Sequence, residues 1–286
     1  MAPRYCVAKY NKNVIYGCMK ENATVIAEEI QKLAARLLAI NPAGHKLCLI
    51  GGFRYRLLNA SCRVSLDIDY HWVGDLARKQ ADIVALLRKK LLPEVKTRFD
   101  YDGNIQPATG PDVDSPAVRV VDMAFYRLGP AGATALAGHR IEVPVEITRI
   151  QCSDPPIVRT VGGTVFLTAS DADMIESKVI ALFNRLHLQA RDIVDIFLFQ
   201  GAFASDSAKR LAAKFAQASL SPKVLGELMN NLAANRNQHV RALDRIIGEQ
   251  LDDTQAANIK LAGGGTMIFN VVMGILQDKL GIKGGP

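Results

Sequence analysis

The sequence has few cysteines and no long apolar run. Residues 1–20 lack the apolar core of a signal peptide, and no apolar stretch reaches the roughly 18 residues of a membrane span. The cysteines are odd in number and show no metal-ligand spacing: Cys6, Cys18, Cys48, Cys62 and Cys152. This pattern argues against a zinc site and favours reduced thiols. We therefore expect a cytoplasmic protein with no membrane association.

Composition sets broad limits on the fold and on the partner. The chain has 286 residues, 49% hydrophobic and 22% charged, which suffices for two domains with a sizeable core. The formal net charge is +7 and the sequence pI is about 9.2. A basic surface attracts polyanions, because each neutralised phosphate releases counterions. The charge favours a nucleic-acid partner without requiring one.

A glycine pair follows a short apolar run. Residues 47–50 predict a buried strand that stops at Gly51 and Gly52, and a helix is expected to begin with Phe53. Backbone N–H groups at such a turn point outward, and the missing Cβ atoms allow a phosphate to approach closely. The glycine pair alone is a weak signal, since most such pairs are ordinary turns.

Two carboxylates follow the glycine pair. Residues 65–71 alternate as in a strand, which predicts that Ser65, Asp67 and Asp69 share one face. Two carboxylates on one strand face can share a divalent cation, and Mg²⁺ prefers hard oxygen ligands completed by substrate phosphates. The order of glycine turn, helix and acidic strand indicates a site for metal-bound nucleotide.

Two sequence blocks resemble a known family. They are Gly51-Gly52 with Arg63-x-Ser65-x-Asp67-Ile-Asp69, and Lys178-x-x-Ala181-Leu182-x-x-Arg185 with Arg191-Asp192-x-x-Asp195. Over residues 45–200 the chain resembles the AbiEii-type toxins of type IV toxin–antitoxin systems, in the polymerase-beta-like nucleotidyltransferase superfamily. The resemblance implies an α+β fold, with a mixed sheet and flanking helices followed by an α-helical C-terminal domain. Phe53-Arg54-Tyr55 stands where the family has small residues, which leaves the nucleotide open.

The resemblance also implies a third carboxylate on a strand beside the acidic one. Residues 117–126 and 139–150 are strand-like and predict a hairpin, after an exposed loop over residues 103–116. Glu146 lies where the family would place that carboxylate, and an unpaired charge in a buried strand is otherwise costly. Asp122 is the rival for the same role.

The second part of the chain is predicted to be helical. Ser170 can cap a helix on which Lys178 and Arg185 share a broad sector, and Asp192 and Asp195 lie one turn apart on the next helical stretch. Arg185 and Arg191 either pair with these acids to lock the helices together or contact substrate. After residue 205 the chain predicts successive helices with no carboxylate cluster. We place the domains at residues 1–168 and 169–286.

The resemblance and the residues together predict a two-metal phosphoryl transfer. Asp67, Asp69 and Glu146 would hold Mg²⁺ or Mn²⁺, and Lys178 and Asp192 would complete the catalytic set. The residues expected to bind the nucleotide are Gly51, Gly52, Ser65, Lys178, Arg185, Arg191 and Asp195. The expected partners are an NTP, an RNA acceptor such as the tRNA 3′ end, and a cognate antitoxin. A small-molecule nucleotidyltransferase acting on an aminoglycoside-like acceptor and a catalytically silent nucleotide-binding module remain alternatives.

Overall fold

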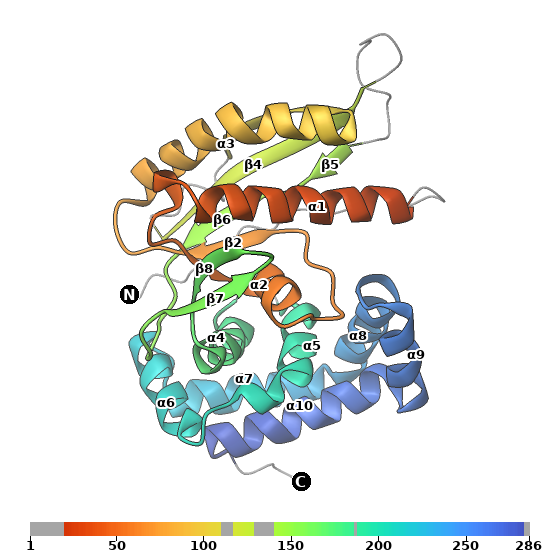
Figure 1. Ribbon diagram of the computed structural model, residues 1–286. Coiled ribbons are helices and arrows are strands. Elements are labelled where there is room, and N and C mark those ends of the chain that lie inside the picture. The colour runs from red at the N-terminus through yellow and green to blue at the C-terminus, as the bar shows by residue number, and fades with distance from the viewer. Residues whose placement is uncertain (1–19, 110–116, 129–139, 186–187, 283–286) are drawn as a thin grey trace.

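A mixed sheet forms the first part of the molecule (Figure 1). The computed structural model describes residues 20–109, 117–128, 140–185 and 188–282. Within them the strand order is β3-β4-β6-β2-β1-β8-β7, and β5 pairs with β4. The parallel pairs are β1 with β8 and β2 with β6. The strands are β1 (Cys48–Ile50), β2 (Ile68–His71), β3 (Tyr101–Pro107), β4 (Val118–Arg127), β5 (Arg140–Glu142), β6 (Val145–Thr148), β7 (Ile157–Val161) and β8 (Thr164–Thr168).

Two long helices cover one face of this sheet (Figure 1). They are α1 (Lys20–Ala39) and α3 (Leu76–Phe99), and a short 3₁₀ turn, η1 (Pro42–Gly44), follows α1. Ile68 and Tyr70 of β2 belong to the apolar core under these helices. Because side chains alternate along a strand, Asp69 points to the opposite face. The sheet thus directs its acidic side chains away from its main core.

The opposite face of the sheet contacts α2 (Gly51–Leu58) and α4 (Asp171–Asn184). Cys48 and Ile50 of β1 pack there with Tyr55 and Met174 in a small separate core. The side chain of Ser170 accepts a hydrogen bond from the N–H of Asp173, so the predicted cap of α4 is confirmed. This small core fixes α4 against the strand that leads into the glycine pair.

A helical region follows α4. It has its own core, which includes Ile268, Phe269, Val272 and Leu276. The division at residue 168 remains a prediction. The helices are α5 (Ala190–Leu198), the 3₁₀ turn η3 (Gln200–Ala202), α6 (Ser207–Gln217), α7 (Pro222–Ala234), α8 (Arg236–Gln250), α9 (Asp253–Leu261) and α10 (Gly264–Leu280).

Several elements differ from the predictions. Residues 103–107 form most of β3 and not a loop, because their backbone pairs with β4 in an antiparallel register from Tyr101↔Arg127 to Pro107↔Val121. Residues 117–127 do pair with residues 140–148, but as two strands, β5 and β6, on β4. The hairpin connection and residues 110–116 lie outside the described residues. The β7–β8 hairpin was not predicted.

The predicted α+β class, a mixed sheet with flanking helices followed by a helical region, is confirmed. No single helix in the described ranges is long and apolar enough to cross a membrane, although α9 and α10, bent by 78°, pass that test together. The cysteines that the structure describes, Cys48, Cys62 and Cys152, are free thiols.

Candidate active site

The glycine pair lies at the junction between β1 and α2. Helix α2 begins at Gly51 itself and not at Phe53, and Gly51 has a φ of +75°. A Cβ atom at Gly51 would overlap the carboxylate of Asp69. A Cβ atom at Gly52 would lie 2.5 Å from Nη2 of Arg63 and 2.7 Å from Oγ of Ser65. The two glycines therefore allow the acidic segment to contact the first turn of the helix.

The three residues after this pair pack into the protein. Arg54 is fully buried and donates hydrogen bonds to Oγ1 of Thr168 at 3.0 Å and to Oδ1 of Asp171 at 2.5 Å. Tyr55 stacks on Phe199, with ring centroids 3.9 Å apart. Phe53 lies in the main core. The residues that depart from the family pattern thus join α2 to α4 and to the sheet.

The acidic segment is only partly a strand. Strand β2 begins at Ile68, so the predicted alternation from Ser65 is wrong for residues 65–67. Ser65 and Asp67 still lie together, because Oγ of Ser65 donates to Oδ1 of Asp67 at 2.7 Å. Asp69 lies on β2 and contacts the glycine turn. Ser65, Asp67 and Asp69 therefore gather at one place, as expected.

Glu146, not Asp122, lies beside the acidic pair. Glu146 is the parallel register partner of Asp69, so the two carboxylates are on neighbouring strands and on the same face. Asp122 lies on β4, which is separated from β2 by β6. The geometry therefore favours Glu146 as the third carboxylate, and its role stays a prediction.

The carboxylates repel one another. Burial, followed by the charges of Asp67 and Glu146, raises the pKa of Asp69 well above its ordinary value. Burial and the charge of Asp67 likewise raise the pKa of Glu146. Both shifts mean that the folded protein disfavours the ionised form of these groups. A cation at this place would relieve the repulsion.

The carboxylates of Asp67, Asp69 and Glu146 fit a divalent cation such as Mg²⁺, because they offer oxygen ligands alone and repel one another without a cation. As the side chains stand, no group of three or more His, Cys, Asp or Glu residues among those described is placed to hold a metal ion. Nη1 of Arg191 lies 3.2 Å from Oδ2 of Asp67. One or two carboxylates are enough for Mg²⁺ when substrate phosphates complete its shell.

An ion-pair network joins α4 to α5. Nζ of Lys178 lies 3.3 Å from Oδ1 of Asp192 and 2.9 Å from Oδ2 of Asp195, so the two acids share one face of α5 as their spacing predicts. Nη1 of Arg185 lies 2.5 Å from Oδ2 of Asp192. The helix-locking interpretation is therefore confirmed for Arg185, whereas Arg191 pairs with Asp67. The network brings the second sequence block to the first.

Arg63 also belongs to the site, although its place in the first sequence block predicted no role for it. Its side chain is 4% exposed, and it pairs with Asp195 through Nε at 2.6 Å and Nη2 at 2.9 Å. The only local signal was its place two residues before Ser65 in the first block. Its partner lies 132 residues away, so only the fold reveals the contact.

A second buried charge cluster lies away from the acidic strand. Nζ of Lys214 lies 2.6 Å from both Asp173 and Glu176, and Arg210 contacts Asp154, Asp173 and Glu176. Two cations of α6 thus bind acids of α4 and of the loop between β6 and β7. The cluster fastens α6 to α4.

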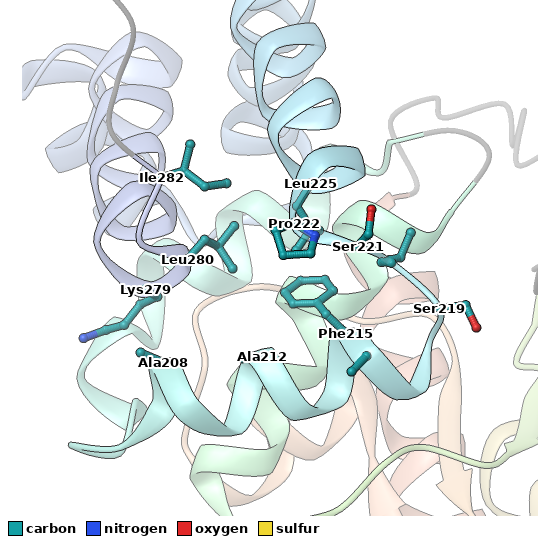
Figure 2. A pocket seen from close by; sticks show the side chains of 12 residues that line it. Ala208, Ala212, Phe215, Ser219, Ser221, Pro222, Leu225, Lys279, Leu280 and Ile282 are labelled. Carbon is teal, nitrogen blue, oxygen red and sulfur yellow. The ribbon is translucent and has the colours of Figure 1, made fainter.

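A cavity of about 440 Å³ lies between α6, the start of α7 and the end of α10 (Figure 2). Its walls are mainly apolar, and Lys279 and Ser219 lie at its rim (Figure 2). None of the predicted site residues lines it. The cavity is therefore separate from the acidic site.

The comparisons with known proteins concern the fold. No protein-family model and no curated protein matches the chain. MenT4, a nucleotidyltransferase toxin from Mycobacterium tuberculosis, is 12% identical over 91% of this chain and 93% of that chain, with a TM-score of 0.50. JHP933 from Helicobacter pylori is 15% identical over 92% and 94%, with a TM-score of 0.49. The chain therefore shares its fold with a nucleotidyltransferase toxin.

Proposed function

We propose that the chain is a metal-dependent nucleotidyltransferase toxin of the AbiEii type, which transfers a nucleotide from an NTP to an RNA acceptor, the 3′ end of tRNA. One observation carries the proposal. Asp69 and Glu146 are register partners on adjacent strands, and Asp69 contacts Gly51 at the start of α2. The fold shared with MenT4 supports the toxin assignment. The net charge of +7 supports an RNA acceptor.

Asp67, Asp69 and Glu146 are the residues that would hold Mg²⁺ or Mn²⁺. When bound, such a cation neutralises the triphosphate and stabilises the charge that develops on the attacking and leaving oxygens. The chain's own contribution is to keep the repelling carboxylates together, by placing Asp69 and Glu146 side by side on one sheet face. Arg191 balances the charge of Asp67 in the absence of substrate.

The phosphates are oriented by groups around the glycine turn. The first N–H groups of α2 have no partner within the helix and attract anions, and Ser65 lies beside them. Nε of Arg185 is a buried donor without a hydrogen-bond partner among the described residues, so it is available to a phosphate oxygen. Asp192 holds Arg185 in place and Lys178 holds Asp195, and Lys178 adds positive charge near the leaving pyrophosphate.

The same proposal includes a cytoplasmic location and a cognate antitoxin that neutralises the chain. Both rest on the resemblance to AbiEii-type toxins. A toxin of this kind arrests growth when it is expressed without its antitoxin. The growth arrest is tested by expressing the wild type and Asp67→Asn while growth and tRNA 3′ ends are followed together. Arrest by Asp67→Asn as well as by the wild type would contradict an arrest that depends on nucleotide transfer.

The central test is transfer of label from each α-³²P NTP, with Mg²⁺ or Mn²⁺, to total tRNA and to an aminoglycoside. Glu146→Gln should lower the rate at least about 100-fold, because it removes a ligand of the cation that would stabilise charge in the transition state. The matched control is Asp122→Asn, which changes an acid one strand farther from Asp69 and should keep the wild-type rate.

The outcomes separate the candidate functions. Label on tRNA that depends on Glu146 supports the proposal. Label on the aminoglycoside alone would identify a small-molecule nucleotidyltransferase. Nucleotide binding without transfer to any acceptor would identify a silent nucleotide-binding module. Equal rates for wild type and Glu146→Gln would contradict the assignment of the third carboxylate.

A further inference from the structure

The guanidinium of Arg63 lies where three parts of the molecule meet. On one side it binds both carboxylate oxygens of Asp195 on α5, at 2.6 and 2.9 Å. On another side its Nη2 occupies the space that a Cβ atom at Gly52 would need. Its Nη1 donates to the backbone oxygen of Val64 at 3.2 Å and lies 3.5 Å from Oε1 of Gln250 at the end of α8.

The backbone around Arg63 is also held by the helical region. The N–H of Val64 donates to the backbone oxygen of Gln250 at 2.8 Å, and the N–H of Asp252 donates to that of Cys62 at 3.1 Å. Arg63 itself forms a β-bridge with Leu251. Figure 1 shows the loop after α2 reaching toward α5 and α8. The segment that carries Ser65 and Asp67 is thus anchored to the helices at the position of Arg63.

The ion pair with Asp195 fixes the direction of the guanidinium. A bidentate arginine–carboxylate pair has two parallel hydrogen bonds and therefore one preferred orientation. Asp195 is 1% exposed and is held on its other side by Lys178. Burial raises the pKa of Asp195, but the charges of Lys178 and Arg63 outweigh it and bring the pKa below its ordinary value. Asp195 is therefore an anion in a fixed position, to which Arg63 donates two hydrogen bonds.

We propose that Arg63 is a positioning residue, which sets Ser65 and the Gly51–Gly52 turn at the spacing that the triphosphate requires and ties that spacing to α5. This inference rests on the proposed function. Arg63 acts through Gly52 and Ser65 and does not contact the reacting atoms. Its removal would let the turn and the acidic segment shift relative to each other, and a misplacement of about 1 Å in a site can cost about 100-fold in rate.

The test compares Arg63→Lys with Arg210→Lys. Both substitutions keep the charge and remove a multidentate guanidinium from buried carboxylates, but Arg210 belongs to the second cluster, away from the acidic strand. Arg63→Lys should lower kcat/KM for the NTP about 10- to 100-fold and leave KM for the RNA unchanged. Arg210→Lys should leave both constants near the wild-type values at a temperature where it is folded.

Chemical rescue provides the second readout. Millimolar guanidinium should restore part of the activity of Arg63→Ala, because the cation can occupy the space beside Asp195 and Gly52. Arg210→Ala should gain no activity under the same conditions. If Arg63→Lys and Arg210→Lys show the same kinetic constants, or if guanidinium has no effect on Arg63→Ala, the positioning role is wrong.

A failure of the proposed function would be visible separately. If the wild type transfers no nucleotide, hydrogen exchange of peptides covering residues 48–58 and 62–70 still tests the inference. Arg63→Lys should raise exchange in both peptides at least about tenfold more than Arg210→Lys, when the two are compared at equal global stability. Equal exchange would overturn the inference whether or not the chain is an enzyme.

Discussion

Replacement of Gly51 by alanine isolates the cost of crowding the acidic strand. Gly51 has a φ of +75° and Gly163, in the turn between β7 and β8, has a φ of +73°. An alanine at either position adopts the left-handed region at about 1–2 kcal/mol. A Cβ atom at Gly163 meets nothing within 4 Å, whereas one at Gly51 overlaps the carboxylate of Asp69. The two alanine variants therefore have the same backbone strain, and only Gly51→Ala adds an overlap with Asp69.

Overpacking of this kind costs typically about 1–3 kcal/mol. We expect Gly51→Ala to lower the free energy of unfolding by that amount more than Gly163→Ala does, as measured by urea denaturation with an unchanged slope. Nucleotide transfer should fall only in Gly51→Ala, because relief of the overlap moves Asp69. Equal destabilisation by the two variants, together with unchanged transfer, would refute the reasoning.

Three further predictions concern the buried charges. Asp69→Asn should stabilise the metal-free protein at neutral pH, because the raised pKa of Asp69 means that its ionisation opposes folding. Thermal melts should show this gain disappearing as falling pH protonates the wild-type carboxyl. Lys214→Met removes one of the two cations that contact the buried carboxylates of Asp173 and Glu176 and should lower the free energy of unfolding by about 3–5 kcal/mol. The exposed Lys209→Met should change it by less than about 0.5 kcal/mol, and equal losses would contradict the role of the cluster. Arg210 lowers the pKa of Asp154 from 3.8 to about 2. The ionised carboxylate therefore stabilises the fold above pH 3.8, and this stabilisation is lost as pH falls through about 2. Acid titration followed by circular dichroism should show a shallower loss of folded structure in Asp154→Asn than in the wild type.

Signals that are local in sequence predicted the centre of the site. The glycine turn, the acidic segment and the cap at Ser170 each depend on residues within a few positions, and the structure places them as expected apart from the early start of α2 and the late start of β2. Local composition misled at residues 103–107, where Gly103 and Pro107 are typical of loops. Pairing with β4 makes this segment a strand at the sheet edge, where proline is tolerated.

Signals that depend on distant partners were not available from the sequence. The contact between Arg63 and Asp195 spans 132 residues, and Arg191 reaches Asp67 across 124. The sequence left open whether Arg185 and Arg191 pair with the acids of α5, and the fold divides the answer between them. The choice between Glu146 and Asp122 likewise required the strand order, because both acids lie in strand-like runs of similar composition.

The long separation between Arg63 and Asp195 has a consequence during synthesis. Ribosomes add about 5–20 residues per second, so roughly 7–26 seconds pass between the emergence of the two residues, which are 132 positions apart. During that interval the nascent chain already carries the glycine turn and the acidic strand, but the carboxylate that receives Arg63 does not yet exist. Strand β8, the parallel neighbour of β1, is also still missing for most of that time. The order of translation therefore makes the site one of the last parts of the molecule to be assembled.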